Sequence, residues 1–569
     1  MNSTCDTTRD RTGPAAGTPT KPAPSPRGRR PNIVFVFTDQ ERYFASWPAG
    51  LVLPARERLA ERGVTFHNHY GPAVMCTSSR AVMLTGVQTP DNGMFENADL
   101  PYVNAMSTDV PTIGHMLRRA GYYTAYKGKW HLDAAFDREP VREVLTDRMN
   151  EYGFSDFGLP VDSLAHELGG YTTDSMIAAG AQSWLRDVGR PMADDGEPWA
   201  LFVSLINPHD IMYFNTDMPG ERVQDTGALL MQPARAPKQA IYQRTWNTTL
   251  PASLGQPFDE AGRPAAHGEF EKAWGYTLGS IPPEPDRWQR FNDFYLNSIR
   301  SADEQVSTLL DELENLALDD QTIVVFTSDH GEMAGAHNLR GKGPFAYEEA
   351  VHLPMYVVHP DVTGGQDFHA LTSHVDLVPS VLAMAGVEPG AADEYAGRRL
   401  PGKDFSGALA DAATADVHSV RDSVLFTYSG LATNDSAAVK LFAEAKAAGK
   451  DPRQVMQDSG FRPDLTKRGS LRMMFDGRYK FTRYFAPTQR NAPADLDDLY
   501  RFNDVELFDL WDDPAEMTNL AATKGDNAEL VLASSAKLEL AIKAEIGVDD
   551  GREMPPFDAV DWQIDRMDL

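Results

Sequence analysis

Three short polar clusters in this sequence contain side chains that could bind a metal ion. The clusters are Asp39-Gln40, Asn207 to Asp210, and Ser328 to Gly331. The first and third clusters together offer two carboxylates, an amide oxygen and an imidazole, supplied by Asp39, Gln40, Asp329 and His330. Such a set suits a divalent cation that is bound mainly through oxygen. Each cluster alone also fits a helix cap or a turn, so the prediction depends on whether the fold brings them together.

The segments that precede the three polar clusters indicate that the fold brings them together. Each cluster follows an apolar run that is typical of a buried parallel strand: Ile33 to Phe37, Trp199 to Ile206, and Thr322 to Thr327. The carboxyl ends of parallel strands meet at one edge of an open α/β sheet, which is where such sheets bind ligands. We therefore expect the three clusters to converge there.

Other segments have recognisable patterns. We predict helices over Ile113 to Ala120, Ser175 to Val188, Asp286 to Asn315 and Asn527 to Ile546, and a strand over Tyr122 to Tyr126. Residues 214 to 285 are rich in Pro, Gly and aromatic residues, which predicts a long irregular lid or binding wall. Alternation over Arg472 to Phe485 predicts one half-exposed antiparallel strand.

The composition of the chain argues against some classes of binding partner. The chain has 569 residues, and Asp and Glu total 82 against 53 Lys and Arg, a formal charge of −29. Such a surface repels nucleic acid and anionic membranes, so we expect neither as a partner. No apolar run is long enough to span a bilayer. The first thirty residues lack the apolar segment of a secretory signal, which predicts a cytoplasmic protein.

We predict three regions along the chain. Residues 1–30 are expected to be a disordered leader, 31–420 the catalytic domain, and 421–569 a C-terminal subdomain with a small antiparallel sheet and a tail. The expected fold class is α/β. A large mixed, mostly parallel sheet lies between helices, and a smaller α+β subdomain packs beside it.

The two cysteines are Cys5 and Cys76, too few for a disulfide framework. Cys76 begins the stretch Cys-Thr-Ser-Ser-Arg-Ala-Val-Met-Leu-Thr-Gly. This stretch resembles the signature of the formylglycine-dependent (type I) sulfatases, Cys-x-Pro-Ser-Arg followed by x-x-x-Leu-Thr-Gly. Further motifs of that family follow in order: Gly121 to Thr124 with Gly128 to His131, Asn207 to His209, Thr327 to Glu332 with Lys342, Tyr347 to Pro354, and Glu506 to Leu520. The resemblance therefore covers Asn32 to about Ala522.

This resemblance to the sulfatases, within the alkaline phosphatase superfamily, implies roles for individual residues. Cys76 would be oxidised to formylglycine by a formylglycine-generating enzyme, and its hydrated aldehyde would be the nucleophile. The other implied catalytic residues are Arg80, Lys129, His131, His209 and Lys342. The implied metal ligands are Asp39, Gln40, residue 76 itself, Asp329 and His330, and Asn97, His209 and Lys342 would contact the substrate. Asn97 also fits a turn or cap.

The sequence departs from the family pattern at two places. Ser78 stands where the aerobic maturation enzyme usually meets proline, and anaerobic maturases accept small residues there. Gln40 and His330 replace Asp and Asn at the metal site, as in the choline sulfatase and phosphonate monoester hydrolase branch. Calcium is the expected ion, with manganese or zinc as alternatives because of the nitrogen ligand.

Three functions remain open on the sequence alone. The first is hydrolysis of a small sulfate monoester, for which Lys129 and His131 argue. The second is hydrolysis of phosphonate monoesters or phosphodiesters, and one enzyme could do both. The third is a non-catalytic anion-binding protein with an unmodified Cys76. A homo-oligomer is expected from the resemblance.

Overall fold

In the computed structural model, the structure describes residues 29–100, 102–136, 145–158 and 167–555. Its centre is an eight-stranded mixed sheet in the order β3-β4-β1-β5-β6-β2-β7, with β8 also paired to β2. The strands are β1 Asn32–Asp39, β2 Val64–Tyr70, β3 Tyr123–Gly128, β4 Trp199–Pro208, β5 Thr322–Ser328, β6 His352–Val358, β7 Gln366–Phe368 and β8 Thr372–Ser373. Within this sheet β3, β4, β1 and β5 are parallel, and β6 is antiparallel to β5 and β2. The predicted fold class is confirmed.

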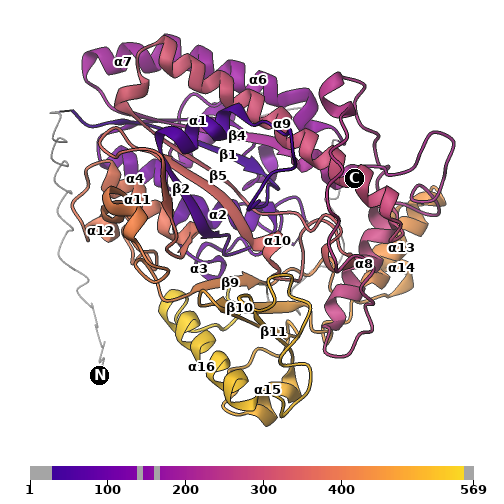
Figure 1. The fold of residues 1–569 in the computed structure, drawn as a ribbon. Coiled ribbons are helices and arrows are strands. Elements are labelled where there is room, and N and C mark those ends of the chain that lie inside the picture. The colour runs from indigo at the N-terminus through magenta and orange to yellow at the C-terminus, as the bar shows by residue number, and fades with distance from the viewer. Residues whose placement is uncertain (1–28, 101, 137–144, 159–166, 556–569) are drawn as a thin grey trace, which may run out of the picture.

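Helices cover both faces of the sheet because β1 is apolar on both sides. Ile33, Phe35 and Phe37 face one core, with α2 Cys76–Thr85, α4 Ile113–Arg119 and α11 Leu377–Met384. Val34 and Val36 face the other core, with α1 Pro54–Arg62, α6 Gly169–Trp184 and α9 Pro285–Asn315. Successive side chains of a strand point to opposite faces, so a continuous apolar run requires two covering layers. Figure 1 shows the sheet between these layers.

A second, four-stranded antiparallel sheet lies below the first and has the order β12-β11-β10-β9 (Figure 1). Its strands are β9 Val424–Tyr428, β10 Ser470–Phe475, β11 Tyr479–Phe485 and β12 Asn503–Asp509. One face packs on α16 Ala528–Glu545 through Leu425, Met474 and Phe481. The other face, which includes Phe426 and Met473, shares a core with Tyr70 of β2 and with Tyr347, the residue before α10 Glu348–Val351. The domain boundary near residue 420 stays a prediction.

Two sequence predictions in these regions are wrong. Arg472 to Phe485 is not one half-exposed strand but the hairpin β10–β11, and nearly all of its side chains are buried. The alternation did not reveal the second covering layer, because α16 lies far along the chain. The segment 214 to 285 is also not wholly irregular, since α8 covers Ala265–Leu278 and buries Phe270 and Trp274.

The remaining helices are short or peripheral. They are α3 Thr89–Asn92, α5 Leu145–Glu151, α7 Arg190–Asp195, α10 Glu348–Val351, α12 Ala392–Ala396, α13 Ser436–Ala447, α14 Pro452–Ser459 and α15 Leu496–Phe502. Among the described residues, no helix combines the length and the apolar character that crossing a membrane requires. Residues 1–28 of the predicted leader lie outside the described residues.

Candidate active site

The carboxyl ends of β1, β4 and β5 meet at one edge of the large sheet, as the sequence predicts. β1 pairs with both neighbours, so that Asp39 lies opposite Pro208 and Thr38 lies opposite Ser328. Parallel pairing thereby brings together three polar clusters that are far apart along the chain.

Helix α2 brings a further pair of side chains to this edge. Cys76 is the first residue of the helix and is only 1% exposed. Arg80 stands four residues later, so both side chains lie on one face of the helix. The helix ends at Gly86, whose φ of 71° is the left-handed conformation that favours glycine.

Four side chains converge into a set that could hold a metal ion. The ligand atoms of Asp39, Cys76, Asp329 and His330 all lie within 4.8 Å of one another. The Cys76 Sγ is 3.2 Å from His330 Nε2 and 3.6 Å from Asp39 Oδ1, and all four residues are buried. Carboxylate oxygens and an imidazole nitrogen are ligands that divalent cations take in proteins. The donor set therefore fits a divalent metal ion.

Gln40 lies beside this cluster, and its side chain is hydrogen-bonded to residues outside the cluster. Its Oε1 accepts a hydrogen bond from Lys342 Nζ at 2.7 Å, and its Nε2 donates to Glu332. Its backbone N–H donates to Asp329 Oδ1 at 3.1 Å. Gln40 thus links a carboxylate of the cluster to Lys342. Its assignment as a metal ligand stays a prediction.

Two cations neutralise the carboxylates of the cluster. Arg80 donates to Asp39 Oδ2 and Asp329 Oδ2, each at 2.9 Å, and Lys129 Nζ also lies 2.9 Å from Asp39 Oδ2. Burial alone raises the pKa of Asp39, but the charges of Lys129 and Arg80 outweigh it and hold that pKa well below its usual range. Asp39 is therefore ionised at neutral pH, as a metal ligand must be.

The two histidines that the sequence singles out differ in their surroundings. Burial, together with the charge of Lys129, lowers the pKa of His209 well below its usual value, although Asp39 opposes the shift. His209 is therefore neutral at pH 7 in the free protein. His131 is fully buried, has a φ of 59°, and places its Nε2 3.5 Å from Asp99 Oδ1.

Asn97 and Asp99 come from the segment that follows α3. The Asn97 Oδ1 accepts a hydrogen bond from the backbone N–H of Thr77 at 3.4 Å, directly after Cys76. This bond favours a role for Asn97 in holding the start of α2. Asp99 was not predicted from the sequence, because a lone acidic residue after a turn carries no recognisable pattern. Its carboxylate could orient the His131 ring.

Several aromatic residues in and around the segment 214 to 285 have mainly packing contacts. Trp246 and Trp288 pack in a core with α9, and Trp274 packs against Phe270. Tyr213 lies beside the His209 ring, with a centroid separation of 5.9 Å. The histidines outside the site have other partners: His67 contacts Tyr43 and Asp367, His69 contacts Thr372, His115 contacts Thr112, and His337 stacks on Tyr347.

Comparison with known proteins gives concordant results. Residues 31–387 match the family model described as Sulfatase. A choline-sulfatase of Rhizobium meliloti is 28% identical over 381 residues, which cover 63% of this chain and 68% of that protein. A protein solved with its substrate D-glucosamine-2-N,6-O-disulfate is 19% identical with a TM-score of 0.60, over 92% of this chain and 100% of that one. A phosphonate monoester hydrolase from Silicibacter pomeroyi is 20% identical with a TM-score of 0.59, over 91% of this chain and 97% of that one.

Proposed function

The chain belongs to the sulfatase family, and from this membership we propose that residue 76, as formylglycine, is the nucleophile with which it hydrolyses sulfate esters. The observation that supports this proposal is the position of Cys76. It lies at the start of α2, between the carboxylates of the cluster and within reach of His330. A formylglycine-generating enzyme is the partner that would convert it, and the buried Ser78 occupies the position that this enzyme reads.

A divalent metal ion completes the proposed site. Asp39, Asp329 and His330 would hold it together with residue 76, and Gln40 would contribute its amide oxygen on releasing Lys342. Calcium suits the oxygen ligands, while the His330 nitrogen keeps manganese and zinc as alternatives. When bound, the ion would supply Lewis-acid polarisation and acidify a hydroxyl at neutral pH.

The residues of this chain would move the protons of the reaction. A hydroxyl of the residue 76 hydrate passes its proton to Asp329 as it attacks the sulfur, and the bond from sulfur to the alcohol oxygen breaks. The leaving oxygen takes a proton from Lys342, while the neutral His209 donates a hydrogen bond to the ester. His131 then removes the proton of the second hydroxyl, which expels sulfate and restores the aldehyde. Water rehydrates the aldehyde, so one ester and one water give one alcohol and one hydrogen sulfate.

Arg80 and Lys129 would bind the non-bridging sulfate oxygens or steady the nucleophile. They provide positive charge in a chain whose formal charge is −29, which otherwise repels an anionic substrate. Asn97, His209 and Lys342 are proposed to contact the substrate. A homo-oligomer and a cytoplasmic location also remain predictions.

Hydrolysis of phosphonate monoesters is the second candidate. It is favoured by Gln40 and His330 at the metal site and by the fold shared with the phosphonate monoester hydrolase. Parallel assays on an aryl sulfate and the matching aryl phosphonate monoester separate the two. We expect the kcat/KM for the sulfate to be higher, because Lys129 and His131 are both in place. A higher value for the phosphonate would reverse the ranking.

His131→Ala is expected to stop the second half of the reaction and spare the first. Without a base for the second hydroxyl, the peptide that contains residue 76 should retain a covalently attached sulfate group. Intact-protein and peptide mass spectrometry after incubation with an aryl sulfate would detect it, together with one rapid equivalent of released phenol. The matched control is His115→Ala, whose side chain contacts Thr112 and Glu151 away from the cluster. Unchanged steady-state turnover in His131→Ala would refute the assigned role.

A further inference from the structure

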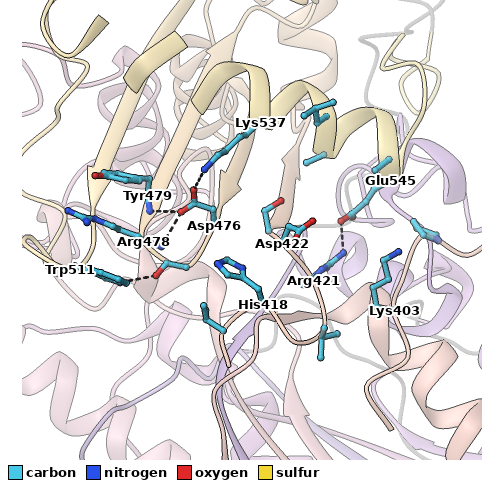
Figure 2. Close-up of a pocket in the computed structure, with 18 of the residues that line it drawn as sticks. Lys403, His418, Arg421, Asp422, Asp476, Arg478, Tyr479, Trp511, Lys537 and Glu545 are labelled. Atoms are coloured by element: carbon cyan, nitrogen blue, oxygen red, sulfur yellow. Dashed lines mark hydrogen bonds and ion pairs between the residues drawn. The ribbon is translucent and has the colours of Figure 1, made fainter. Parts of the chain in front are cut away.

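A cavity lies at the C-terminal subdomain, and none of the proposed active-site residues lines it. It has a volume of about 810 Å³, within the range of small-ligand sites. Its walls are α16, the turn between β10 and β11, and the segment 399–423 (Figure 2). We call it the α16 groove. Figure 2 shows Trp511 and Arg478 at one end and Arg421 and Lys403 at the other.

The α16 groove is positively charged in an acidic protein. Five cations line it, against three carboxylates. Two of the carboxylates are already paired, since Asp476 is bound by Lys537 at 2.5 Å and Glu545 by Arg421 at 2.6 Å. Arg399 and Lys403 form no ion pair with any carboxylate in the described residues, and Arg399 donates only to the Ala544 carbonyl. The groove therefore has a surplus of positive charge, with Asp422 as the single opposing unpaired carboxylate.

Arg421 lines the groove from a buried position. Its side chain is only 5% exposed, and its Nη2 is bound to Glu545. Its Nε and Nη1 have no hydrogen-bond acceptor among the described residues, although Nη1 lies 3.4 Å from Asp376 Oδ2. Buried donors without acceptors are costly, so an acceptor oxygen from a ligand would stabilise this arrangement. A guanidinium beside a lysine is a common receptor for sulfate and carboxylate groups.

Trp511 presents a flat apolar face at the other end of the groove. It is 69% exposed, yet two contacts fix its orientation. Its indole N–H donates to the Gly477 carbonyl at 3.1 Å, and the Arg478 guanidinium stacks on the ring at 4.9 Å. Asp509 in turn holds Arg478 at 2.6 Å. A rigid exposed tryptophan loses little conformational entropy when a ligand covers it, and such residues are enriched at binding sites.

We propose that the α16 groove binds an acidic saccharide, with a sugar ring on the Trp511 face and its sulfate or carboxylate group at Arg421, Arg399 and Lys403. An aromatic platform suits the apolar face of a sugar ring, and the cations suit its acidic substituent. The choice of sulfate as that substituent rests on the proposed function, because a sulfatase meets sulfated ligands. The groove would then hold a sulfated saccharide away from the catalytic residues.

The test is a calorimetric titration of the full chain with a defined sulfated disaccharide. The chain carries Cys76→Ser, so that the ligand is not consumed. Trp511→Ala and Lys403→Gln are each added to this background. We expect each to remove one binding site or weaken it by about tenfold or more, as the loss of a central aromatic or cationic contact does. The control is Lys440→Gln on α13, an exposed lysine that pairs with Glu444 outside the groove.

Further measurements distinguish loss of saccharide binding from misfolding and from other occupants of the groove. Trp511→Phe keeps a ring and should retain much of the affinity, which separates loss of the platform from misfolding. In the chain with native Cys76, Trp511→Ala should leave aryl sulfate turnover unchanged. Equal binding by Trp511→Ala would overturn the proposal, as would inorganic sulfate matching the disaccharide in affinity. A change in oligomeric state with Trp511→Ala would assign the groove to a second copy. Groove binding without any sulfate-ester turnover would refute the proposed function instead.

Discussion

Cys76→Ala abolishes sulfate-ester turnover, with an expected loss of about 10⁴-fold or more in kcat, as with removal of other enzymic nucleophiles. The reason is chemical, because alanine cannot be converted to an aldehyde hydrate. The buried site should remain folded, since the change deletes only the sulfur at the first turn of α2. Steady-state assays with an aryl sulfate measure the effect, and thermal unfolding verifies the fold.

Two controls make this result specific to residue 76. Cys5→Ala removes the only other cysteine of the sequence and should leave turnover unchanged. Peptide mass spectrometry across Cys76, after expression with a formylglycine-generating system, should show an aldehyde or its hydrate. A fully active chain whose residue 76 remains a thiol would contradict the proposed nucleophile.

Replacement of Arg80 should damage both stability and activity. In Arg80→Gln, Asp39 and Asp329 lose the guanidinium that bridges them, and both carboxylates are fully buried. Lys129 still pairs with Asp39, but Asp329 loses its arginine partner, and leaving a buried charge unpaired lowers the free energy of unfolding by about 3–5 kcal/mol. Turnover should fall by about 10³-fold, because a preorganised cation is lost from the charge that develops during reaction. Chemical denaturation and steady-state kinetics measure the two effects.

Arg80→Lys separates charge from geometry. It keeps one positive charge but cannot reach Asp39, Asp329, Ser204 and the Lys129 carbonyl together, as the guanidinium does. We expect it to recover much of the stability and little of the activity. If Arg80→Gln unfolds at the same denaturant concentration as the unsubstituted chain, the buried carboxylates do not need Arg80 for the stability of the fold, and the prediction is wrong.

The sequence was most informative where one segment predicted both a strand and the position of a ligand site. The run Ile33 to Phe37 predicted a strand buried on both faces, and the polar pair after it predicted where a ligand would lie. The same reasoning applied to β4 and β5, so the convergence of Asp39, His209 and Asp329 followed from three independent strand ends. Roles for Cys76 and Arg80 came from the resemblance, because residue types alone gave no reason to choose them.

Other features depend on contacts that no local pattern records. The half-exposed prediction for β10–β11 failed because α16, about sixty residues later, covers the hairpin. Asp99 lies near His131 only through tertiary packing, and Arg421 and Trp511 share one groove although ninety residues separate them. The helix α8 was missed because two glycines interrupt its apolar residues and nearby prolines favoured a loop.

The burial of Cys76 limits the time during biosynthesis in which a modifying enzyme could reach its thiol. The thiol is enclosed partly by His330, which lies 254 residues later in the chain and is therefore made well after it. Ribosomes add about 5–20 residues per second, so roughly 10 to 50 seconds pass between the two. During that interval the cysteine has no closed pocket around it, and afterwards an enzyme could reach it only by unfolding the protein. The proposed conversion of Cys76 would thus compete with folding, and slower elongation or delayed closure of β5 onto β1 would raise the converted fraction.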